Sequence, residues 1–277
     1  MGNEFQSLRT LTEDLRLVTV CEEAGCPNIF ECWASGTATF MVNGERCTRA
    51  CGFCLIDTRK PLALDPTEPE RVGEAVVRLG LHHAVITCVA RDDLADGGAG
   101  AIAQTVRAIR ERSPSTNVEV LTSDLKGDPA SLQLIIDAAP DVMNHNVETV
   151  ARLQRAVRPS AGYLRSLTVL ARSAAAGLTT KSGLMVGLGE TADEVEETLA
   201  DMAAVGVSIA TIGQYLRPTE QHLPVARWWD PEEFVDLARR GRRLGLAHVQ
   251  SSPLTRSSYH AKEALSDATP VAAPSRR

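Results

Sequence analysis

The sequence of 277 residues is 44% hydrophobic and 23% charged, which is the composition of a folded globular protein. A formal net charge of −6 argues against nucleic acid or an anionic membrane as the main partner, and no apolar run approaches the roughly 18 residues of a membrane helix. Residues 1–6 contain neither a basic nor an apolar region, so we expect no secretory signal and predict a cytoplasmic protein.

The chain opens with an amphipathic helix, expected over residues 7–17, in which three leucines recur at helical spacing. A first cysteine triplet then follows in the pattern C-x4-C-x5-C, formed by Cys21, Cys26 and Cys32. Gly25 and Pro27 flank its middle cysteine and indicate a loop rather than a helix.

A second triplet comes after a strand expected over residues 37–42, which ends at the turn dipeptide Asn43-Gly44. It has the pattern C-x3-C-x2-C and is formed by Cys47, Cys51 and Cys54. Three thiolates this close together can hold one face of a small metal centre, and they leave the fourth ligand position of a four-iron cluster open. The alternative is a zinc site, but zinc usually takes four ligands from paired cysteine motifs.

Six of the seven cysteines lie between positions 21 and 54. Without a secretory signal, reduced cysteines that bind metal are a better interpretation than disulfides. Because the two spacings differ, two separate three-thiolate sites fit better than one six-cysteine zinc cluster, which the sequence leaves open. The seventh cysteine, Cys88, lies in an apolar strand and is expected to be an inert buried residue.

Strands and helices alternate over the rest of the chain. Apolar runs predict six strands, at residues 37–42, 84–89, 118–121, 141–144, 180–186 and 209–215, and a weaker seventh at 247–250. Periodic segments predict the helices between them, at residues 68–79, 99–109, 129–139, 148–157, 165–176, 192–205 and 231–244. Capping boxes are expected at Thr67 with Glu70 and at Thr191 with Glu194.

This alternation predicts an α/β fold with a parallel sheet covered on its outer face. Six strands fall short of the eight of a closed barrel, so we predict a partial (βα)6 barrel.

Polar residues and glycines stand near the ends of these strands, where a barrel places its active site. The candidates are Asp96, Gly97 and Gly98 after the second strand, Asn146 and Glu148 after the fourth, Lys181 at the start of the fifth and Gln214 at the end of the sixth. Some of these candidates have a plainer explanation. The glycines can form a tight turn, and Asn146 and Glu148 can form a solvated loop and a helix cap.

Phe53 precedes the third cysteine of the second triplet, and this arrangement resembles the radical S-adenosylmethionine (radical SAM) superfamily. The run V-C-E-E-A-G-C-P-N at positions 20–28, followed by the second triplet, is more specifically similar to the lipoyl synthases. The run R-S-S-Y-H-A at positions 256–261 is also similar to them. The resemblance covers nearly the whole chain, from about residue 8 to about residue 265.

The resemblance implies two 4Fe–4S clusters. It assigns Cys21, Cys26, Cys32 and Ser258 to an auxiliary cluster, and Cys47, Cys51 and Cys54 to a cluster whose open iron chelates SAM. Phe53 and the strand-end candidates would then contact SAM. A serine oxygen is harder than a thiolate and a poorer match for iron–sulfide, so we expect the Ser258 link to be the most easily released.

The implied reaction is radical SAM-dependent insertion of two sulfur atoms at C6 and C8 of an octanoyl group carried on a protein lysine. The auxiliary cluster would donate the sulfur, and two SAM molecules would be used per lipoyl group. The implied partners are octanoylated carrier domains (2-oxoacid dehydrogenase E2 subunits and glycine cleavage H protein), ferredoxin or flavodoxin as electron donor, and an iron–sulfur carrier for cluster repair. Rival hypotheses are a biotin synthase-like or methylthio-transferring radical SAM enzyme, a zinc-stabilised scaffold protein and an inactive paralogue.

We expect four segments: an N-terminal helix with the auxiliary-cluster cysteines (1–36), the barrel (37–250), a C-terminal extension with the serine ligand (251–266) and a disordered tail (267–277). Two features depart from the resemblance. Only twenty residues precede the first triplet, where lipoyl synthases usually have several tens, and residues 251–255 replace a glycine-led segment.

Overall fold

The computed structural model describes residues 10–23 and 26–268. Its eight strands form one sheet in sequence order, with β1 and β8 at the two edges. β2 to β8 run parallel, while the two-residue β1 pairs antiparallel with β2. The strands are β1 (Val18–Thr19), β2 (Thr37–Val42), β3 (His83–Cys88), β4 (Asn117–Leu121), β5 (Val142–Asn144), β6 (Thr179–Val186), β7 (Ile209–Gln214) and β8 (His248–Ser251).

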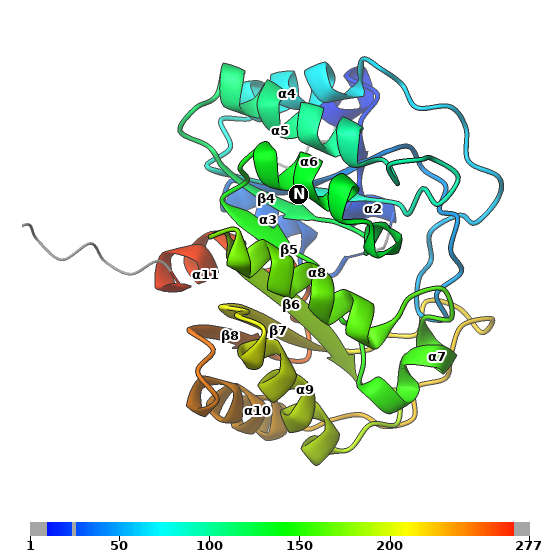
Figure 1. The fold of residues 1–277 in the computed structure, drawn as a ribbon, viewed down its shortest axis with the longest axis vertical. Coiled ribbons are helices and arrows are strands. Elements are labelled where there is room, and N and C mark those ends of the chain that lie inside the picture. Colours follow the sequence, from blue (N-terminus) through cyan, green and yellow to red (C-terminus); the bar gives the residue numbers. More distant parts are fainter. Residues whose placement is uncertain (1–9, 24–25, 269–277) are drawn as a thin grey trace, which may run out of the picture.

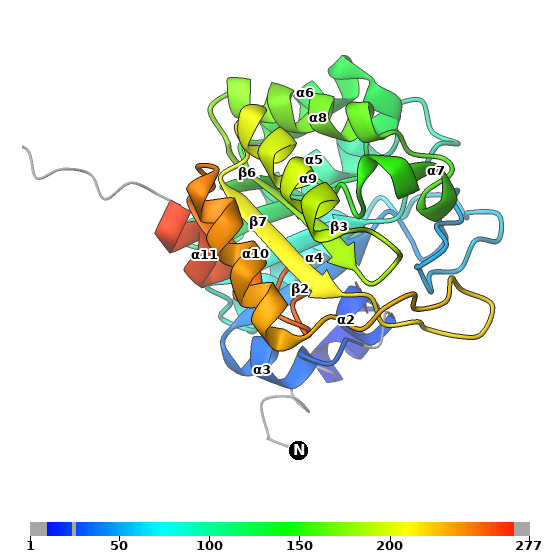
Figure 2. The same ribbon diagram turned by 90° about the horizontal axis from the view of Figure 1, so that it is seen from below.

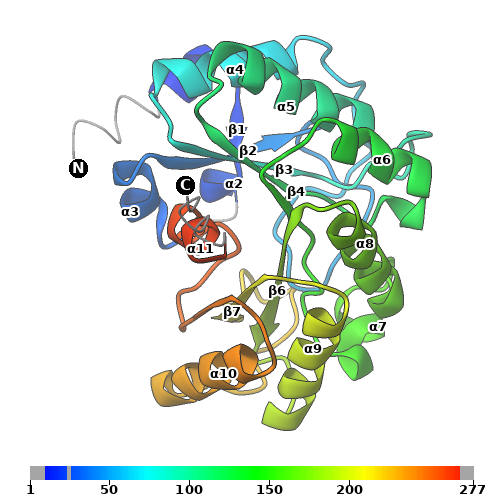
Figure 3. The ribbon, with the colours of Figure 1, turned by 60° about the vertical axis from the view of Figure 1, so that its left-hand side comes forward.

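Helices cover the outside of this sheet, as Figure 1 shows from the side. In Figure 3 the strands form an arc with α4, α5, α6, α8, α9 and α10 outside it, and α2, α3 and α11 lie in its opening. The helices are α2 (Val20–Glu23), α3 (Ile29–Ala34), α4 (Glu68–Arg78), α5 (Ala99–Arg112), α6 (Pro129–Asp137), α7 (Gln154–Val157), α8 (Tyr163–Ala175), α9 (Ala192–Ala204), α10 (Pro231–Arg243) and α11 (Ala261–Ala268). The predicted partial barrel is confirmed, with β2 to β7 as the six predicted strands and β8 as the weaker seventh.

The helix predicted over residues 148–157 is wrong in its first half. Glu148 has a φ of 67°, outside the helical region. Its backbone N–H donates to the carbonyl of Gly183 and its carbonyl accepts from the N–H of Met185, both at 2.9 Å, so it continues the pairing of the sheet. Helical structure begins only with the 3₁₀ turn Ala151–Leu153, which leads into α7.

One predicted capping box is confirmed and the other is wrong. The Thr191 hydroxyl accepts from the Glu194 N–H at 3.3 Å, and the Glu194 carboxylate accepts from the Thr191 N–H at 2.9 Å. The box predicted at Thr67 does not form. The Asp65 carboxylate instead accepts from the Thr67 N–H at 2.8 Å and from the Thr67 hydroxyl at 2.7 Å. A carboxylate two residues earlier therefore competes with the threonine for the helix start.

The two chain ends fit the prediction only in part. Residues 10–14 are helical, inside the helix expected over residues 7–17. The predicted disordered tail is helical at residues 267 and 268, which end α11, and residues 269–277 lie outside the described residues.

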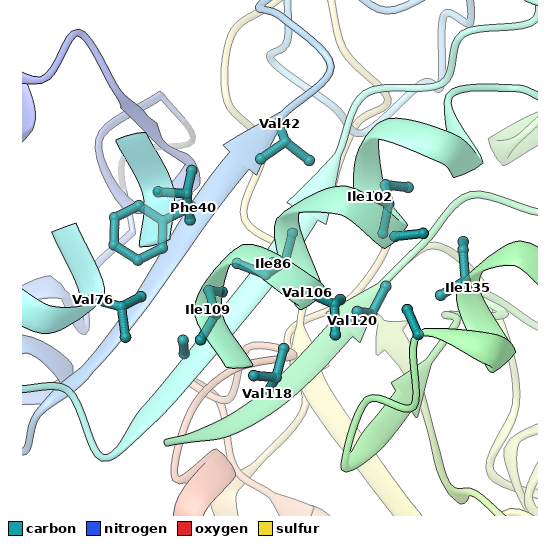
Figure 4. Close-up of a cluster of buried hydrophobic side chains, with 14 of the residues drawn as sticks. Phe40, Val42, Val76, Ile86, Ile102, Val106, Ile109, Val118, Val120 and Ile135 are labelled. Atoms are coloured by element: carbon teal, nitrogen blue, oxygen red, sulfur yellow. The ribbon is translucent and has the colours of Figure 1, made fainter. Parts of the chain in front are cut away.

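Side chains along the strands alternate between the outer core and the barrel interior. Figure 4 shows Val118 and Val120 of β4 in the apolar layer with Ile102 and Ile109 of α5. Glu119 lies between the two valines and therefore projects from the opposite face, into the barrel.

The barrel interior contains a buried polar cluster around Glu119. Its carboxylate lies 3.0 Å from the Lys181 Nζ and accepts from the Asn144 side chain at 2.7 Å. Burial favours a raised pKa for Glu119, but the charge of Lys181 and contacts from His83 and Asn144 outweigh it and lower the pKa to about 2. Lys181 is thus held inside the barrel, and the structure does not bring it to the mouth where we expected it.

Candidate iron–sulfur and SAM site

The site lies at the end of the barrel where the parallel strands finish. The loop after β2, helix α7 and the loop after β7 gather at this end in both Figure 1 and Figure 2. The loop after β2 carries the second cysteine triplet. Its three cysteines and Phe53 line a cavity of about 230 Å³ together with residues that follow β3, β4 and β5.

The triplet loop is tied down from three directions. The Thr48 N–H donates to the Ala90 carbonyl after β3 at 2.9 Å, and the Gly52 N–H donates to the Val157 carbonyl at the end of α7 at 2.9 Å. From the loop after β7, the His222 Nε2 lies 3.0 Å from the Cys54 carbonyl. These contacts fix the positions of the three cysteines without using their sulfur atoms.

Backbone N–H groups donate to the first of the three sulfur atoms. The Cys47 Sγ accepts from the backbone N–H groups of Arg49 and Ala90, each at 3.4 Å. Burial raises the pKa of the Cys51 thiol, and the nearby Arg158 guanidinium opposes this by hydrogen bonding and charge. Burial also raises the pKa of Cys54 to about 11, opposed by the Ile56 N–H. Donors aimed at sulfur favour the charged thiolate that binds iron.

Arg49, inside the triplet, is one of two buried arginines that line this cavity. Its guanidinium donates to Asp92 at 2.7 and 2.8 Å and to Asp124 at 2.6 Å. Two carboxylates therefore neutralise its charge and hold the loop against the ends of β3 and β4.

Asn146 and Glu148 lie on the wall of this cavity, as the sequence predicted for residues after the fourth strand. The Asn146 amide donates to the Glu148 carboxylate at 3.1 Å and to the Ser257 hydroxyl at 2.7 Å. Burial raises the pKa of Glu148, and the charge of Arg158 opposes it. A carboxylate and an amide thus face the same space as the cysteines.

The glycines after β3 serve a different purpose. Gly97 and Gly98 have φ values of 62° and 87°, and the Asp96 carboxylate accepts from the Gly98 N–H at 2.9 Å. A Cβ on Gly98 would lie 2.3 Å from the amide nitrogen of Asn43. Asp96, Gly97 and Gly98 form the turn that starts α5, and the structure does not place them on the wall of either cavity at this end of the barrel.

The first triplet lies in the opening of the barrel, with Cys21 on α2, Cys32 on α3 and Cys26 between them. Burial raises the pKa of Cys21 to about 11, and the nearby Cys26 adds to this. Burial likewise raises the pKa of Cys32 to about 12, with further increments from Cys21 and Cys26. The three thiols are thus close enough to affect one another electrostatically.

The segment that carries Ser258 is clamped onto this triplet region from the far end of the chain. The Tyr259 hydroxyl donates to the Glu31 carboxylate at 3.1 Å, and the His260 Nε2 lies 3.0 Å from it. The Asn28 amide donates to the Leu254 carbonyl at 2.7 Å. The structure therefore brings residues 254–260 beside α3, as the assignment of Ser258 to the first triplet requires.

A second cavity, of about 290 Å³, lies between the two triplets. Its wall includes Val20 and Pro27 from the first triplet region, Phe53 and Cys54 from the second, and Gln214 at the end of β7. Most of the remaining wall is apolar, including Leu55, Ile56, Leu184, Met185 and Leu216. Asn146 and Glu148 line this cavity too, so the two spaces meet at these residues.

Comparison with known proteins identifies this arrangement. The radical SAM superfamily pattern matches residues 41–202. The lipoyl synthase of Rubrobacter xylanophilus is 54% identical over 96% of this chain and 84% of its own length. The lipoyl synthase of Mycobacterium leprae is 54% identical over 94% of this chain and 83% of its own.

The chain belongs to the lipoyl synthase family. These enzymes are sulfur-inserting radical SAM enzymes that use SAM and 4Fe–4S clusters, including an auxiliary cluster. The rival hypotheses of another radical SAM sulfur transferase and of a zinc-stabilised scaffold are not supported.

Solved structures of other radical SAM enzymes share the fold. The maturase HydG gives a TM-score of 0.62 at 14% identity, covering 84% of this chain and 54% of its own. Methylornithine synthase (PylB) gives 0.57 at 15% identity, covering 91% of this chain and 83% of its own.

The residues present fit the clusters of a lipoyl synthase by the chemistry of their donors. All seven cysteines are free, and six of them fall in the two triplets. In the part of the chain that the structure describes, no three His, Cys, Asp or Glu side chains are drawn together tightly enough for a single metal ion. No helix among those residues is long and apolar enough to cross a membrane.

The sequence did not point to several residues of this lipoyl synthase site. Arg158 carries no recognisable signal, since it follows a four-residue helix. Glu31 and Asn28 act through partners more than 220 positions away, at Leu254, Tyr259 and His260. Ser257 and His260 could have been found, because both lie in the R-S-S-Y-H-A run that we singled out for Ser258.

Proposed function

We propose that the two triplets divide the work of a lipoyl synthase. Cys47, Cys51 and Cys54 hold the cluster that chelates SAM, and Cys21, Cys26, Cys32 and Ser258 hold the auxiliary cluster. When bound, the first supplies the electron that cleaves SAM, and the second supplies the sulfur inserted at C6 and C8 of the octanoyl chain. The single observation that carries this proposal is the second cavity, whose wall combines residues of both triplet regions.

The chain's own residues position the substrates. The apolar wall of the second cavity suits an octanoyl chain, for which each buried methylene group is worth about 0.8 kcal/mol. Phe53, Asn146 and Glu148 line both cavities, and Gln214 lines the second, so these four are the contacts that we assign to SAM. The positions of Asp96, Gly97, Gly98 and Lys181 support structural roles instead.

The proposed macromolecular substrates are octanoylated carrier domains, namely E2 subunits of 2-oxoacid dehydrogenases and the glycine cleavage H protein. Ferredoxin or flavodoxin would supply electrons, and an iron–sulfur carrier would rebuild the auxiliary cluster. Seven free cysteines suit a reducing compartment, so we propose that the enzyme acts in the cytoplasm.

The test is an assay of the anaerobically reconstituted protein for 5′-deoxyadenosine and for lipoyl product on an octanoylated carrier domain. The proposal predicts a brown protein with about eight irons per chain that forms both products. A protein with two clusters that forms 5′-deoxyadenosine but no lipoyl group would contradict the substrate, and a colourless protein with zinc would contradict the cofactors.

A further inference from the structure

Two buried arginines line the cavity of the second triplet, and they differ in how their charge is balanced. Arg49 forms ion pairs with Asp92 at 2.7 Å and Asp124 at 2.6 Å. Arg158 is 7% exposed, and in the described part of the chain it has no carboxylate at ion-pair distance. A buried positive charge without a paired carboxylate is costly, so the position of Arg158 beside the triplet requires an explanation.

The backbone of the neighbouring loops holds Arg158 rigidly. Its Nη1 donates to the carbonyls of Asn146 at 2.9 Å and Val147 at 3.2 Å, both in the loop after β5. The residue before it, Val157, accepts from the Gly52 N–H inside the triplet at 2.9 Å. The guanidinium is thereby held on the wall of the cavity that Cys51 also lines.

Part of the guanidinium remains available. The Arg158 Nε is buried and has no hydrogen-bond partner. Glu148 faces the same cavity, but it lies beyond ion-pair distance and its carboxylate accepts from Asn146. The positive charge of Arg158 is therefore free to act on whatever the second triplet binds.

We propose that Arg158 raises the reduction potential of the SAM cluster by holding a buried positive charge beside the second triplet. This inference rests on the proposed assignment of that cluster to Cys47, Cys51 and Cys54. An added electron makes the cluster more negative, so a nearby buried cation stabilises the reduced form more than the oxidised form. Arg49, neutralised by two aspartates, contributes far less.

The experiment is an EPR-monitored redox titration without SAM. It is made in the Cys21→Ala background, where only the SAM cluster should remain at about four irons per chain. Arg158→Met should lower the ratio of reduced to oxidised cluster at a fixed potential about tenfold, equivalent to about 59 mV for a one-electron couple. Arg158→Lys keeps the charge but not the planar fork, so its reduction potential should lie between those of Arg158→Met and the Cys21→Ala parent.

Arg165→Met is the matched control. Arg165 pairs with the same Asp124 at 3.2 Å but does not line the cavity, so its removal should leave the potential unchanged. If Arg158→Met does not retain its iron, Arg158→Gln replaces it as the neutral variant. An unchanged potential in an iron-containing neutral variant, even with weakened SAM binding, would overturn the proposal. Absence of the cluster in the Cys21→Ala parent would instead refute the assignment on which it rests.

Discussion

The two cysteine triplets lie in one molecule but have contrasting surroundings. The Cys47 triplet is tied by hydrogen bonds to the segments after β3, at the end of α7 and after β7, and the Arg49–Asp124 pair beside it is almost fully buried, at 5% and 0% side-chain exposure. The Cys21 triplet sits on short helices in the opening of the barrel (Figure 3). The Glu31–His260 contact that closes it is exposed, at 59% and 41%.

The charged residues near the two triplets also differ. Arg158 lowers the pKa of Cys51 against the effect of burial, more than the Glu148 carboxylate raises it, whereas Glu31 and Glu263 add to the effect of burial on Cys32. Positive charge favours a bound anionic cluster, and negative charge opposes it. The comparison suggests that one site is built to keep its cluster, while the other is built to let its cluster be replaced.

The largest effects are expected from two separate variants, each of which lacks one cysteine of one triplet. Cys51→Ala should abolish 5′-deoxyadenosine formation, because the proposed assignment places the SAM-cleaving cluster at that site. Cys21→Ala should keep 5′-deoxyadenosine formation and abolish the lipoyl product. Each variant should hold about four irons per chain, measured together with both products. The reverse pattern of products would exchange the roles of the two triplets.

A glycine in β7 allows the Ser258 segment to approach the barrel. A Cβ on Gly213 would lie 2.1 Å from the Thr255 backbone oxygen, so the segment must shift in Gly213→Ala. We expect a loss of about 1–3 kcal/mol in unfolding free energy, as for other overpacked sites, and a greater loss of lipoyl product than of 5′-deoxyadenosine. Gly162→Ala, where the nearest atom is 3.5 Å away, is the control. Equal losses of the two products would show that the Ser258 segment does not serve the first triplet alone.

Ser258→Cys tests whether the serine makes the auxiliary cluster easy to dismantle. A thiolate matches iron–sulfide better than a hydroxyl oxygen, so both clusters should assemble while lipoyl formation falls severalfold. Iron content and single-turnover product would be measured side by side. Wild-type rates of lipoyl formation in this variant would count against the weak-link explanation.

The smallest effect is expected from the exposed clamp. Glu31→Gln removes the charge that binds Tyr259 and His260, and exposed pairs of this kind contribute little to stability. A chelator should therefore extract auxiliary-cluster iron moderately faster, without changing iron loss from the Cys47 site. Glu22→Gln, on the same side of the barrel but outside the clamp, provides the comparison. Identical extraction rates in both variants would exclude a role for the clamp in retention.

Local sequence patterns predicted the features that depend on residues close together in the chain. Apolar runs located the six strands, and the different cysteine spacings separated the two triplets. Lys181, at the start of the fifth predicted strand, was expected among the mouth residues, whereas Glu119, 62 positions earlier, holds it in the barrel interior. The Glu31 clamp and the Arg158 guanidinium likewise depend on contacts between distant loops, which no local pattern encodes.

The division between a retained and a replaced cluster can be measured in a single turnover. The fully reconstituted enzyme would be given SAM, reduced flavodoxin and an octanoylated carrier domain, and its iron would be followed by Mössbauer and EPR spectroscopy as the lipoyl group forms. We predict that iron falls from about eight to about four per chain, and that the remaining signal is the one absent from Cys51→Ala. Lipoyl formation with both clusters intact, or with loss of the cluster at Cys47, Cys51 and Cys54, would contradict the division between a retained and a replaced cluster.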